Sequence, residues 1–495
     1  MEELNYTQKP FAEQPKISVS DAVFAWISLA LGFIFTHFAV RFCGGIWGGI
    51  IWALFGIMGA VFVKVKAVKI KPAHAVIFGI AELFCLAPLF SASEFTNILA
   101  AWFSFLLYLY LTIAISGAEL FGRHFVSDLL QSVFVRPFEK FFVRQPKSAF
   151  SVFRERSRSK TVMYALLGLI IAMPLTIVVV LLLMSSDELF SDTMHSFTEH
   201  LPSLSPSLFR DMLFAVPVAM FLFDVIFSIR KAAPEHSEAA PKYRVFPSVA
   251  AYFTVTPICV FYLIYIITQF VNIANAIEKT LDYSAFARRG FFELCAIAVI
   301  NLAVITLIQA FTKRNDLDIK PIALRVYTIM ISLFTLLIIA TAITKMLMYI
   351  GEYGMTLLRV YTSWFMILLA LIFVLIIALQ IRDYRIWRAI FAAFAAMLTI
   401  LCFGNFDGAI ARYNISAYQS GKLSELDISE FYELGIPAVK PAAELLESGK
   451  LSSYEKKRLQ DFLRNEKYND ETRDGFAYFS IPRAAARSAI ERLNI

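Results

Sequence analysis

Residues 360–381 read Val360-Tyr-Thr-Ser-Trp-Phe-Met-Ile-Leu-Leu-Ala-Leu-Ile-Phe-Val-Leu-Ile-Ile-Ala-Leu-Gln-Ile381 and contain no charged side chain. About 20 apolar residues are enough for a helix to cross the hydrocarbon core of a membrane. The stretch therefore predicts a transmembrane helix, and further stretches of this kind on both sides of it predict a polytopic membrane protein.

The composition of the whole chain indicates the same class. Of 495 residues, 58% are hydrophobic and 17% are charged, whereas soluble domains carry about 25% charged residues. We predict an all-α fold: a transmembrane bundle over 20–404, a polar N-terminal tail over 1–19, and a small helical extramembrane domain over 405–495. Eleven apolar runs predict the spans, at 20–40, 44–63, 73–90, 94–117, 161–185, 211–230, 248–271, 290–311, 322–344, 360–381 and 386–404.

The distribution of lysine and arginine predicts the orientation of the bundle. The N-terminal tail and the even-numbered connections hold 26 of these residues, and the odd-numbered connections hold 7. Positive residues near helix ends are retained on the cytoplasmic side. We therefore expect a cytoplasmic N-terminus and an extracytoplasmic C-terminal domain.

The longest inner connection, 118–160, alternates aromatic and basic residues, as in Phe134-Val-Arg-Pro-Phe-Glu-Lys-Phe-Phe-Val-Arg144. Basic amphipathic segments bind anionic headgroups while their aromatic side chains enter the interface. We expect this segment to contact anionic membrane lipids, with a docking site for a cytoplasmic partner as the alternative. Nucleic acid is not an expected partner.

Ionisable side chains inside apolar spans are costly to bury and are candidates for function. Here they are Glu82, Asp224, Glu293 and Lys345. A proton or ion relay needs several such groups around one cavity, which a sequence cannot demonstrate. The favoured interpretation of each residue is an interhelical hydrogen bond or a side chain that reaches the interface.

Metal and cofactor sites are not expected. His195, Glu199 and His200 lie in a predicted acidic outer loop, but their spacing is one residue too long for the inverted zinc-protease pattern. All five cysteines lie in or at the ends of apolar spans without paired spacing, which is typical of small buried hydrophobic side chains.

Three short polar segments fall on the predicted outer face: 281–294, 345–359 and 404–414. The second interrupts two spans with Gly351 and Gly354, where glycine permits a break. If the third is helical, Asn405 shares a face with Arg412, and Asp407 shares one with Asn414. The candidate outer-face polar cluster is Arg288, Arg289, Glu293, Arg359, Asn405, Asp407, Arg412 and Asn414.

The same segments carry a family resemblance. The runs, in chain order, are Ala287-Arg-Arg-Gly-Phe-Phe-Glu-Leu294, Tyr353-Gly-Met-Thr-Leu-Leu-Arg359, Asn405-Phe-Asp-Gly-Ala-Ile-Ala-Arg-Tyr-Asn414 and Asp427-Ile-Ser-Glu-Phe-Tyr-Glu-Leu-Gly-Ile-Pro-Ala-Val439. Over residues 205–450 the chain resembles the bacterial membrane-protein family called domain of unknown function 4173, which is related to 4153. The resemblance implies a bacterial cell membrane and implies no activity.

The C-terminal region has the start signals of soluble helices. Ser452 and Glu455 form a capping box, Pro482 follows a cap at Ser480, and a short helix is expected at 441–448. We expect a bundle of four or five short helices.

Three hypotheses for function follow. The first is a structural, sensory or accessory component of the cell envelope, whose outer domain binds an envelope protein. The second is a transporter or flippase-like protein for an anionic substrate, attracted by the outer arginines. The third is a membrane enzyme with Asp407 or Glu293 as base, while Arg288 and Arg412 hold a phosphate.

Overall fold

The computed structural model describes residues 17–39, 45–151, 206–232, 247–278, 291–312, 322–449, 451–472 and 475–493, with short pieces between 176 and 194. Within these ranges every regular element is a helix. The all-helical expectation is therefore confirmed for the part of the chain that the structure describes.

The long helices follow the predicted spans. They are α1 (Val19–Ile34) with the short π-helix η1 (Phe35–Ala39), α2 (Ile46–Val65), α3 (Pro72–Cys85) with α4 (Ala87–Phe90), α5 (Glu94–Ile115), α10 (Pro206–Phe227) with η4 (Ser228–Arg230), α11 (Ser248–Glu278), α13 (Phe291–Phe311), α14 (Ile322–Tyr353), α15 (Leu357–Ile381) and α16 (Ile386–Phe403).

Nine of these helices, with α3 and α4 counted as one, are long and apolar enough to cross a membrane, among the residues described. They indicate a multi-pass membrane protein. The predicted span at 248–271 corresponds to α11, whose described apolar part is Tyr252–Thr268. The predicted span at 161–185 lies largely outside the described residues.

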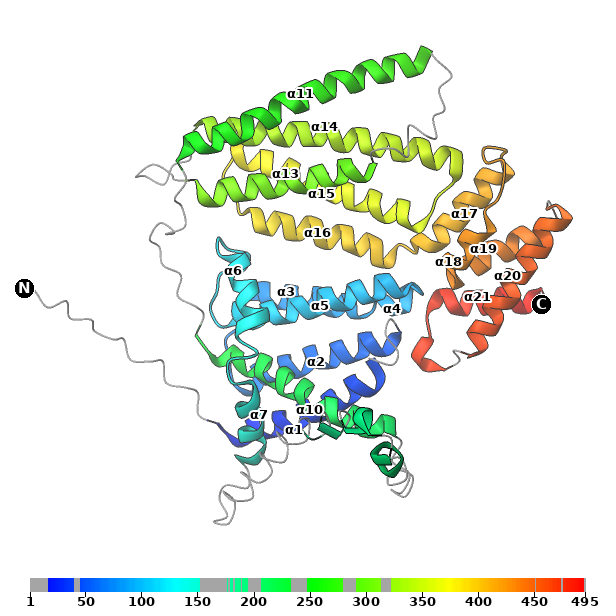
Figure 1. Cartoon of the computed structure of the whole chain (residues 1–495). Helices are drawn as coiled ribbons and strands as arrows, with labels where there is room; N and C mark the ends of the chain where they lie inside the picture. The colour runs from blue at the N-terminus through cyan, green and yellow to red at the C-terminus, as the bar shows by residue number, and fades with distance from the viewer. Residues whose placement is uncertain are drawn as a thin grey trace, which may run out of the picture.

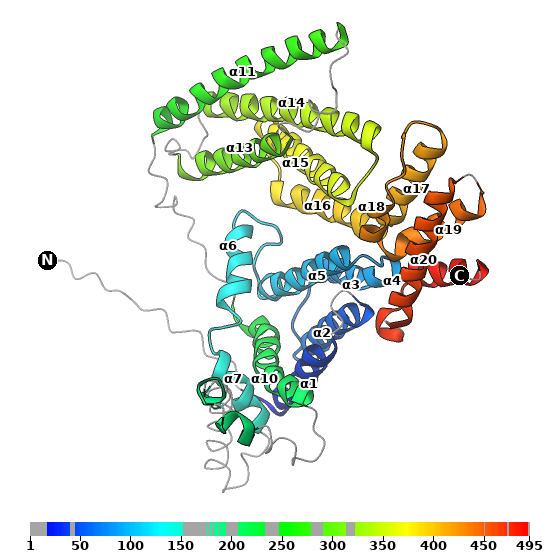
Figure 2. The ribbon, with the colours of Figure 1, turned by 45° about the vertical axis from the view of Figure 1, so that its right-hand side comes forward.

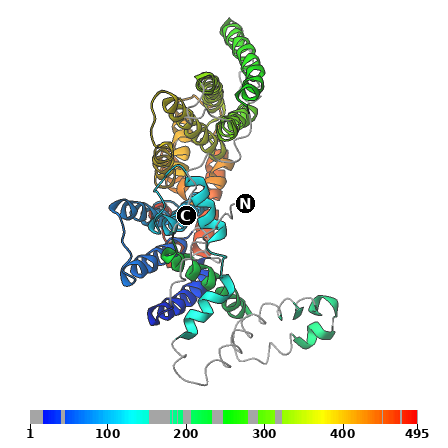
Figure 3. The ribbon, with the colours of Figure 1, turned by 90° about the vertical axis from the view of Figure 1, so that its left-hand side faces the viewer.

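The spans pack into two groups that α16 joins. One hydrophobic cluster is built from α1, α2, α3, α5 and α10, and the last turns of α16 belong to it through Leu398, Leu401 and Cys402. A second cluster joins α11, α13, α14 and α15. The two groups lie one above the other in Figure 1, and Figure 3 shows α11 at the edge of the bundle.

The two ends of the bundle differ. At the first, which we call the basic end, α1 begins, α2, α5 and α10 end, and α15 turns into α16. Lys66 at the end of α2 bonds to Ser18 and Ser20 at the start of α1, which places these termini together. The other, which we call the junction end, carries the C-terminal helices (Figures 1 and 2).

The connection after α5 lies at the basic end and folds into α6 (Phe125–Leu130), η2 (Gln131–Val135) and α7 (Phe141–Ala149). Phe134, Phe138 and Phe142 are exposed, as an amphipathic segment beside a membrane requires. Arg136 and Arg144 are buried against the bundle. The expected contact between basic residues and lipid headgroups therefore does not extend to these two arginines.

The C-terminal helices are α17 (Phe406–Gln419), α18 (Ile428–Leu434), α19 (Ile436–Glu447), α20 (Ser453–Thr472), η5 (Phe476–Tyr478) and α21 (Ile481–Arg492). Phe431 and Phe462 are fully buried in their shared cluster, and Met355, Leu357 and Val360 from the bundle pack against it. The C-terminal helices and the start of α15 therefore share one core.

The predicted caps of these helices are present. The Glu455 carboxylate accepts the Ser452 N–H at 2.9 Å, and the Ser480 hydroxyl accepts the Arg483 N–H at 3.4 Å. The helix predicted at 441–448 begins earlier, at Ile436, and contains Pro437 and Pro441. Pro437 lies in the first turn, where a missing N–H costs no helical hydrogen bond, so it starts the helix instead of preceding it.

Candidate functional site

The turn between α14 and α15 is held by a side chain of α17. The Asn414 Oδ1 atom accepts the Met355 N–H at 2.7 Å, and its Nδ2 atom donates to the Met355 carbonyl at 2.8 Å. Gly354 has a φ of +78°, and an added Cβ would lie 2.8 Å from Asn414 Oδ1. Only glycine fits this conformation without strain, so the turn and Asn414 form one unit.

Arg359 closes the end of α14. Its guanidinium donates to the carbonyls of Tyr353 and Gly354 and lies 4.4 Å from the centre of the Tyr349 ring. A cation at a helix C-terminus satisfies the last carbonyls and interacts favourably with the helix dipole. This arginine from the predicted cluster therefore has a structural set of partners.

Glu430 on α18 holds the start of α15. Its buried carboxylate accepts the N–H of Leu357, the first residue of α15, at 3.0 Å. Burial raises the pKa of Glu430 to about 7, while the Leu357 N–H lowers it and the neighbouring carboxylates of Glu433 and Asp427 raise it. An acid from the C-terminal helices thus supplies an acceptor that the span itself lacks.

Asn405 and Asp407 lie at the start of α17. Asn405 adopts a left-handed backbone conformation, with φ 44°, and its side chain accepts the Gly408 N–H at 3.3 Å. Asp407 is buried, and its carboxylate lies 3.5 Å from the Tyr361 hydroxyl of α15. Burial raises the pKa of Asp407 to about 6, against hydrogen bonds from Ser93 and Tyr361 that lower it.

The remaining members of the predicted cluster lie elsewhere. Arg412 is exposed on α17, on the opposite side from the buried Asp407 and Asn414. Glu293 is exposed in the first turn of α13 and acts electrostatically on the buried Lys345 of α14. Arg288 and Arg289 lie outside the described residues, so their predicted contacts are not placed.

A cavity of about 470 Å³ lies between part of the bundle and the C-terminal helices, and we call it the junction cavity. Its described lining includes five carboxylates and one arginine: Glu94, Asp407, Glu433, Glu466, Asp470 and Arg483. Arg483 pairs with Asp470 at 3.2 Å, and Arg487 also bonds to Asp470. The cavity therefore has an excess of acidic groups.

An apolar groove of about 580 Å³ runs along the bundle beside this cavity. Its lining comes from α2, α5 and α10 and includes Trp52, Trp102 and Phe221. Gly45, Pro88 and Asn97 line both the groove and the junction cavity. The two spaces therefore meet at the junction end.

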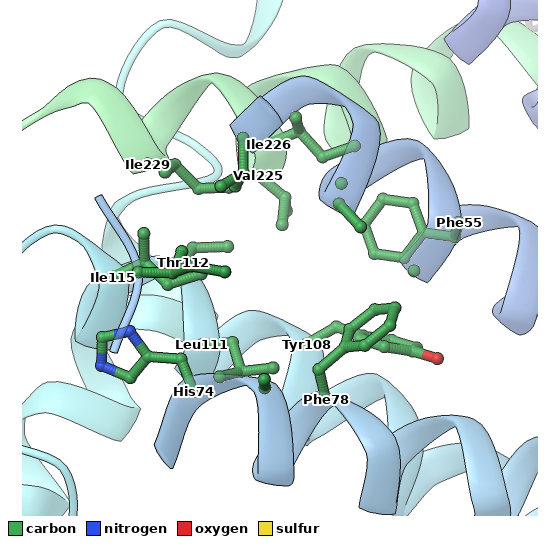
Figure 4. A pocket seen from close by; sticks show the side chains of 16 residues that line it. Phe55, His74, Phe78, Tyr108, Leu111, Thr112, Ile115, Val225, Ile226 and Ile229 are labelled. Atoms are coloured by element: carbon green, nitrogen blue, oxygen red, sulfur yellow. The ribbon is translucent and has the colours of Figure 1, made fainter. Parts of the chain in front are cut away.

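A smaller cavity of about 150 Å³ lies between α2, α3, α5 and α10 (Figure 4). Its labelled lining is mostly aliphatic and aromatic, and His74 stands at one side. The His74 ring accepts the Lys71 N–H at 3.3 Å and thereby caps α3. Because this lining is mostly apolar, it does not identify a catalytic group.

Metal-ligand geometry is absent from the described residues, in which no group of three or more histidine, cysteine or acidic side chains could hold an ion. His195, Glu199 and His200 lie outside those residues.

The family follows from the match between the chain and a family model. The model of the family described as Domain of unknown function (DUF4153) matches residues 78–445. The chain belongs to this family. No curated protein and no solved structure gave a match.

The DUF4153 match refines the resemblance predicted from the four polar runs. The family shown is 4153, related to the predicted 4173, and its region begins within α3 instead of near residue 205. The region ends within α19 and so includes Asn414 and Glu430, the two side chains that hold the α14–α15 turn.

Two residues of the DUF4153 region, Tyr361 and Glu430, act at the junction and were not predicted. Tyr361 lies in an apolar span, and Glu430 lies in a short amphipathic helix with its apolar neighbours Ile428 and Phe431. The available signal for Glu430 was an acid at a position that the helical period assigns to the buried face. That signal indicates burial and does not identify the partner.

Asp224 and Glu82, two of the four ionisable residues predicted inside spans, have bundle partners. Asp224 of α10 pairs with Arg144 of α7 at 2.8 Å, and the Tyr108 hydroxyl donates to Glu82 at 2.9 Å. For these two residues the geometry fits the predicted interhelical hydrogen bonds.

Proposed function

We propose that the protein is a sensory or accessory component of a bacterial cell envelope, in which the C-terminal helices pass a binding event to the spans α14 and α15. The observation that carries the proposal is the hold on the α14–α15 turn by Asn414 and Glu430. A displacement of α17 and α18 must either move this turn or break its hydrogen bonds.

Packing supports the same coupling. Met355, Leu357 and Val360 pack against the cluster of the C-terminal helices, so apolar contacts accompany the hydrogen bonds. Coupling between sites needs a physical element whose position both sites influence. The first turn of α15 meets this requirement because it belongs to a span and contacts the C-terminal helices.

The proposed orientation places the basic end in the cytoplasm and the C-terminal helices outside. Lys64, Lys66, Arg230, Arg385 and Arg388 all belong to the basic end, as the positive-inside rule requires. Exposed Phe134 and Phe142, with the exposed Lys147, would contact the inner leaflet and its anionic headgroups. An envelope protein would bind the exposed side of the C-terminal helices.

Hydrogen exchange of the full chain in lipid nanodiscs tests the coupling. Asn414→Ala leaves both backbone groups of Met355 without their partners, a loss of about 1–3 kcal/mol. We expect residues 353–360 to exchange at least about tenfold faster, with the change extending into the adjoining turns of α14 and α15. Asn465→Ala, on the exposed side of α20, is the matched control.

Exchange in α14 and α15 at the wild-type rate in Asn414→Ala would refute the coupling. So would a change confined to the C-terminal helices.

Transport of an anionic substrate is the weaker proposal. The junction cavity has five carboxylates and one arginine among its described lining residues. This excess of negative charge repels an anion. Flux of organic acids or lipid phosphates through proteoliposomes is expected at background. Flux well above background that Asp407→Asn alters would replace the sensory proposal with the transporter.

The enzyme hypothesis draws less support from the site. Asp407 lies in the junction cavity, but Arg412, its proposed phosphate-binding partner, is on an exposed face of α17 and not among the described cavity residues.

A further inference from the structure

The junction cavity has the charge of a cation site. Of its five carboxylates, Asp470 is engaged by Arg483 and Arg487. The other acidic lining residues are Glu94, Asp407, Glu433 and Glu466, of which Glu94 and Glu466 take part in further interactions within the protein, and Arg483 is the one basic residue in the described lining. A partly enclosed space with this lining concentrates cations and repels anions.

The lining also favours an organic cation over a bare metal ion. Tyr361, Tyr432 and Phe95 are lining residues, together with the carboxylates, and the ring of Tyr478 is already covered by Arg483. Aromatic faces attract ammonium groups, and carboxylates accept their hydrogen bonds. With about 470 Å³, the cavity has the size of the pockets that hold small organic groups.

The apolar groove supplies the second half of an amphiphile site. It meets the junction cavity at Gly45, Pro88 and Asn97 and extends along the bundle to Phe138 and Phe141 at the basic end. A Cβ added to Gly48 would meet no atom within 4 Å, so the groove is open along this side of α2. Its exposed Trp102 is a side chain suited to the lipid interface.

We propose that the junction cavity and the groove form one binding site for an aminophospholipid of the surrounding membrane. The protonated amine lies beside Asp407 and Glu433, and Arg483 stands on the phosphate side of the headgroup. One acyl chain follows the groove past Trp52 and Trp102. The site does not depend on the coupling proposed above, since binding can occur whether or not it moves α15.

Native mass spectrometry of the full chain, delipidated in detergent, tests this site. The probes are dioleoyl phosphatidylethanolamine and dioleoyl phosphatidylglycerol, which have the same chains and differ in the headgroup. We expect the amine-bearing lipid to bind at least about fivefold more tightly, since one lost charged contact is worth about 1 kcal/mol or more. Equal retention of the two lipids would overturn the proposal.

Variants separate the two halves of the site. Asp407→Asn with Glu433→Gln should weaken phosphatidylethanolamine binding about tenfold or more and leave phosphatidylglycerol binding unchanged. Glu119→Gln makes the same kind of change at the basic end, outside the site, and should bind as wild type does. A double variant that retains wild-type selectivity would contradict the role of the carboxylates.

Filling the groove tests the chain-binding half. Gly48→Leu should abolish lipid binding and leave binding of the soluble headgroup, glycerophosphoethanolamine, intact. Ala101→Leu, from α5, repeats the test from the opposite wall in case Gly48→Leu fails to fold. Lipid binding that survives in the folded variants would overturn the amphiphile proposal. Spermidine, a soluble organic cation, is a further probe: if it binds while the protein does not discriminate between the two lipids, the site holds a cation only and the amphiphile proposal is overturned.

Discussion

The two ends of the bundle use their carboxylates differently. At the basic end, Asp21 lies 2.5 Å from Lys66 and 3.2 Å from Arg230, and Asp224 lies 2.8 Å from Arg144. At the junction end, Glu430 accepts a backbone N–H, and Asp407 faces a tyrosine hydroxyl. Asp21 and Asp224 are neutralised by cations of the protein, whereas Glu430 and Asp407 accept hydrogen bonds from neutral groups.

This difference separates carboxylates whose ion pairs stabilise the fold from Asp407, which we propose contacts a ligand. A buried ion pair holds two helices in one arrangement, because removal of either partner leaves an uncompensated charge. A buried acid with neutral partners retains its attraction for an added cation. We call the ion pairs of Asp21 and Asp224 at the basic end the clamp, and the junction end is where we propose that a ligand binds.

Breaking the clamp should have the largest effect. Arg144→Ala leaves the fully buried Asp224 without its cation and removes the guanidinium from the Phe227 ring. We expect destabilisation of about 3–5 kcal/mol. The measurements are a lower abundance of the protein in the membrane and a lower midpoint of thermal unfolding in detergent.

The matched variant is Arg144→Met with Asp224→Leu, which removes both charges and keeps apolar volume. It should recover much of the lost stability. If Arg144→Ala unfolds at the wild-type midpoint, the clamp does not hold the fold.

A change at Glu430 should have an intermediate effect that depends on pH. Its pKa is raised from 4.5 to about 7 in the folded protein, so the folded state binds the extra proton between these values. The contribution of this proton to the free energy of unfolding is complete below the pKa of Glu430 in the unfolded state and is lost as pH rises through about 7. Glu430→Gln keeps an acceptor for Leu357 and cannot ionise.

We therefore expect the free energy of unfolding of Glu430→Gln to rise relative to that of the wild type by up to about 3 kcal/mol between pH 5 and pH 8. The measurement is the unfolding midpoint of both proteins as a function of pH. Parallel curves would mean that Glu430 does not titrate in the folded state over this range.

The smallest effect is expected at the surface of the basic end. Glu119 is about half exposed and lies 3.0 Å from Arg385 and 3.7 Å from Arg388. Glu119→Gln should cost less than about 1 kcal/mol, and 0.5 M salt should remove the difference. A larger, salt-insensitive loss would show that the clamp extends to this surface.

Local signals predicted the helices well. Apolar length located the spans, and the Ser452–Glu455 and Ser480–Pro482 caps were predicted from residues three or fewer positions apart. Such features depend on neighbouring residues, which the sequence displays directly. Pro437 misled the boundary of α19 because a proline in the first turn starts a helix as readily as it ends one, and Pro441, where the predicted helix began, lies inside α19.

The site depends on distant residues, and the sequence predicted it only in part. Asn414 and Asp407 were predicted to share a face, and both are buried toward the bundle. Their partners, Met355 and Tyr361, are 59 and 46 positions away. No spacing rule connects residues so far apart, so the predicted outer cluster emphasised arginines, while the structure brings carboxylates around the junction cavity.

The hold on the α14–α15 turn also sets an order of events in biogenesis. The ribosome makes α14, α15 and α16 before it makes Asn414 and Glu430, so these spans emerge before the side chains that hold the turn exist. Until then, Met355 and Leu357 lack those partners. A nascent chain halted before residue 414 therefore holds the full length of these three spans and an unfinished turn, and closure of the C-terminal helices onto the bundle is a late step of maturation.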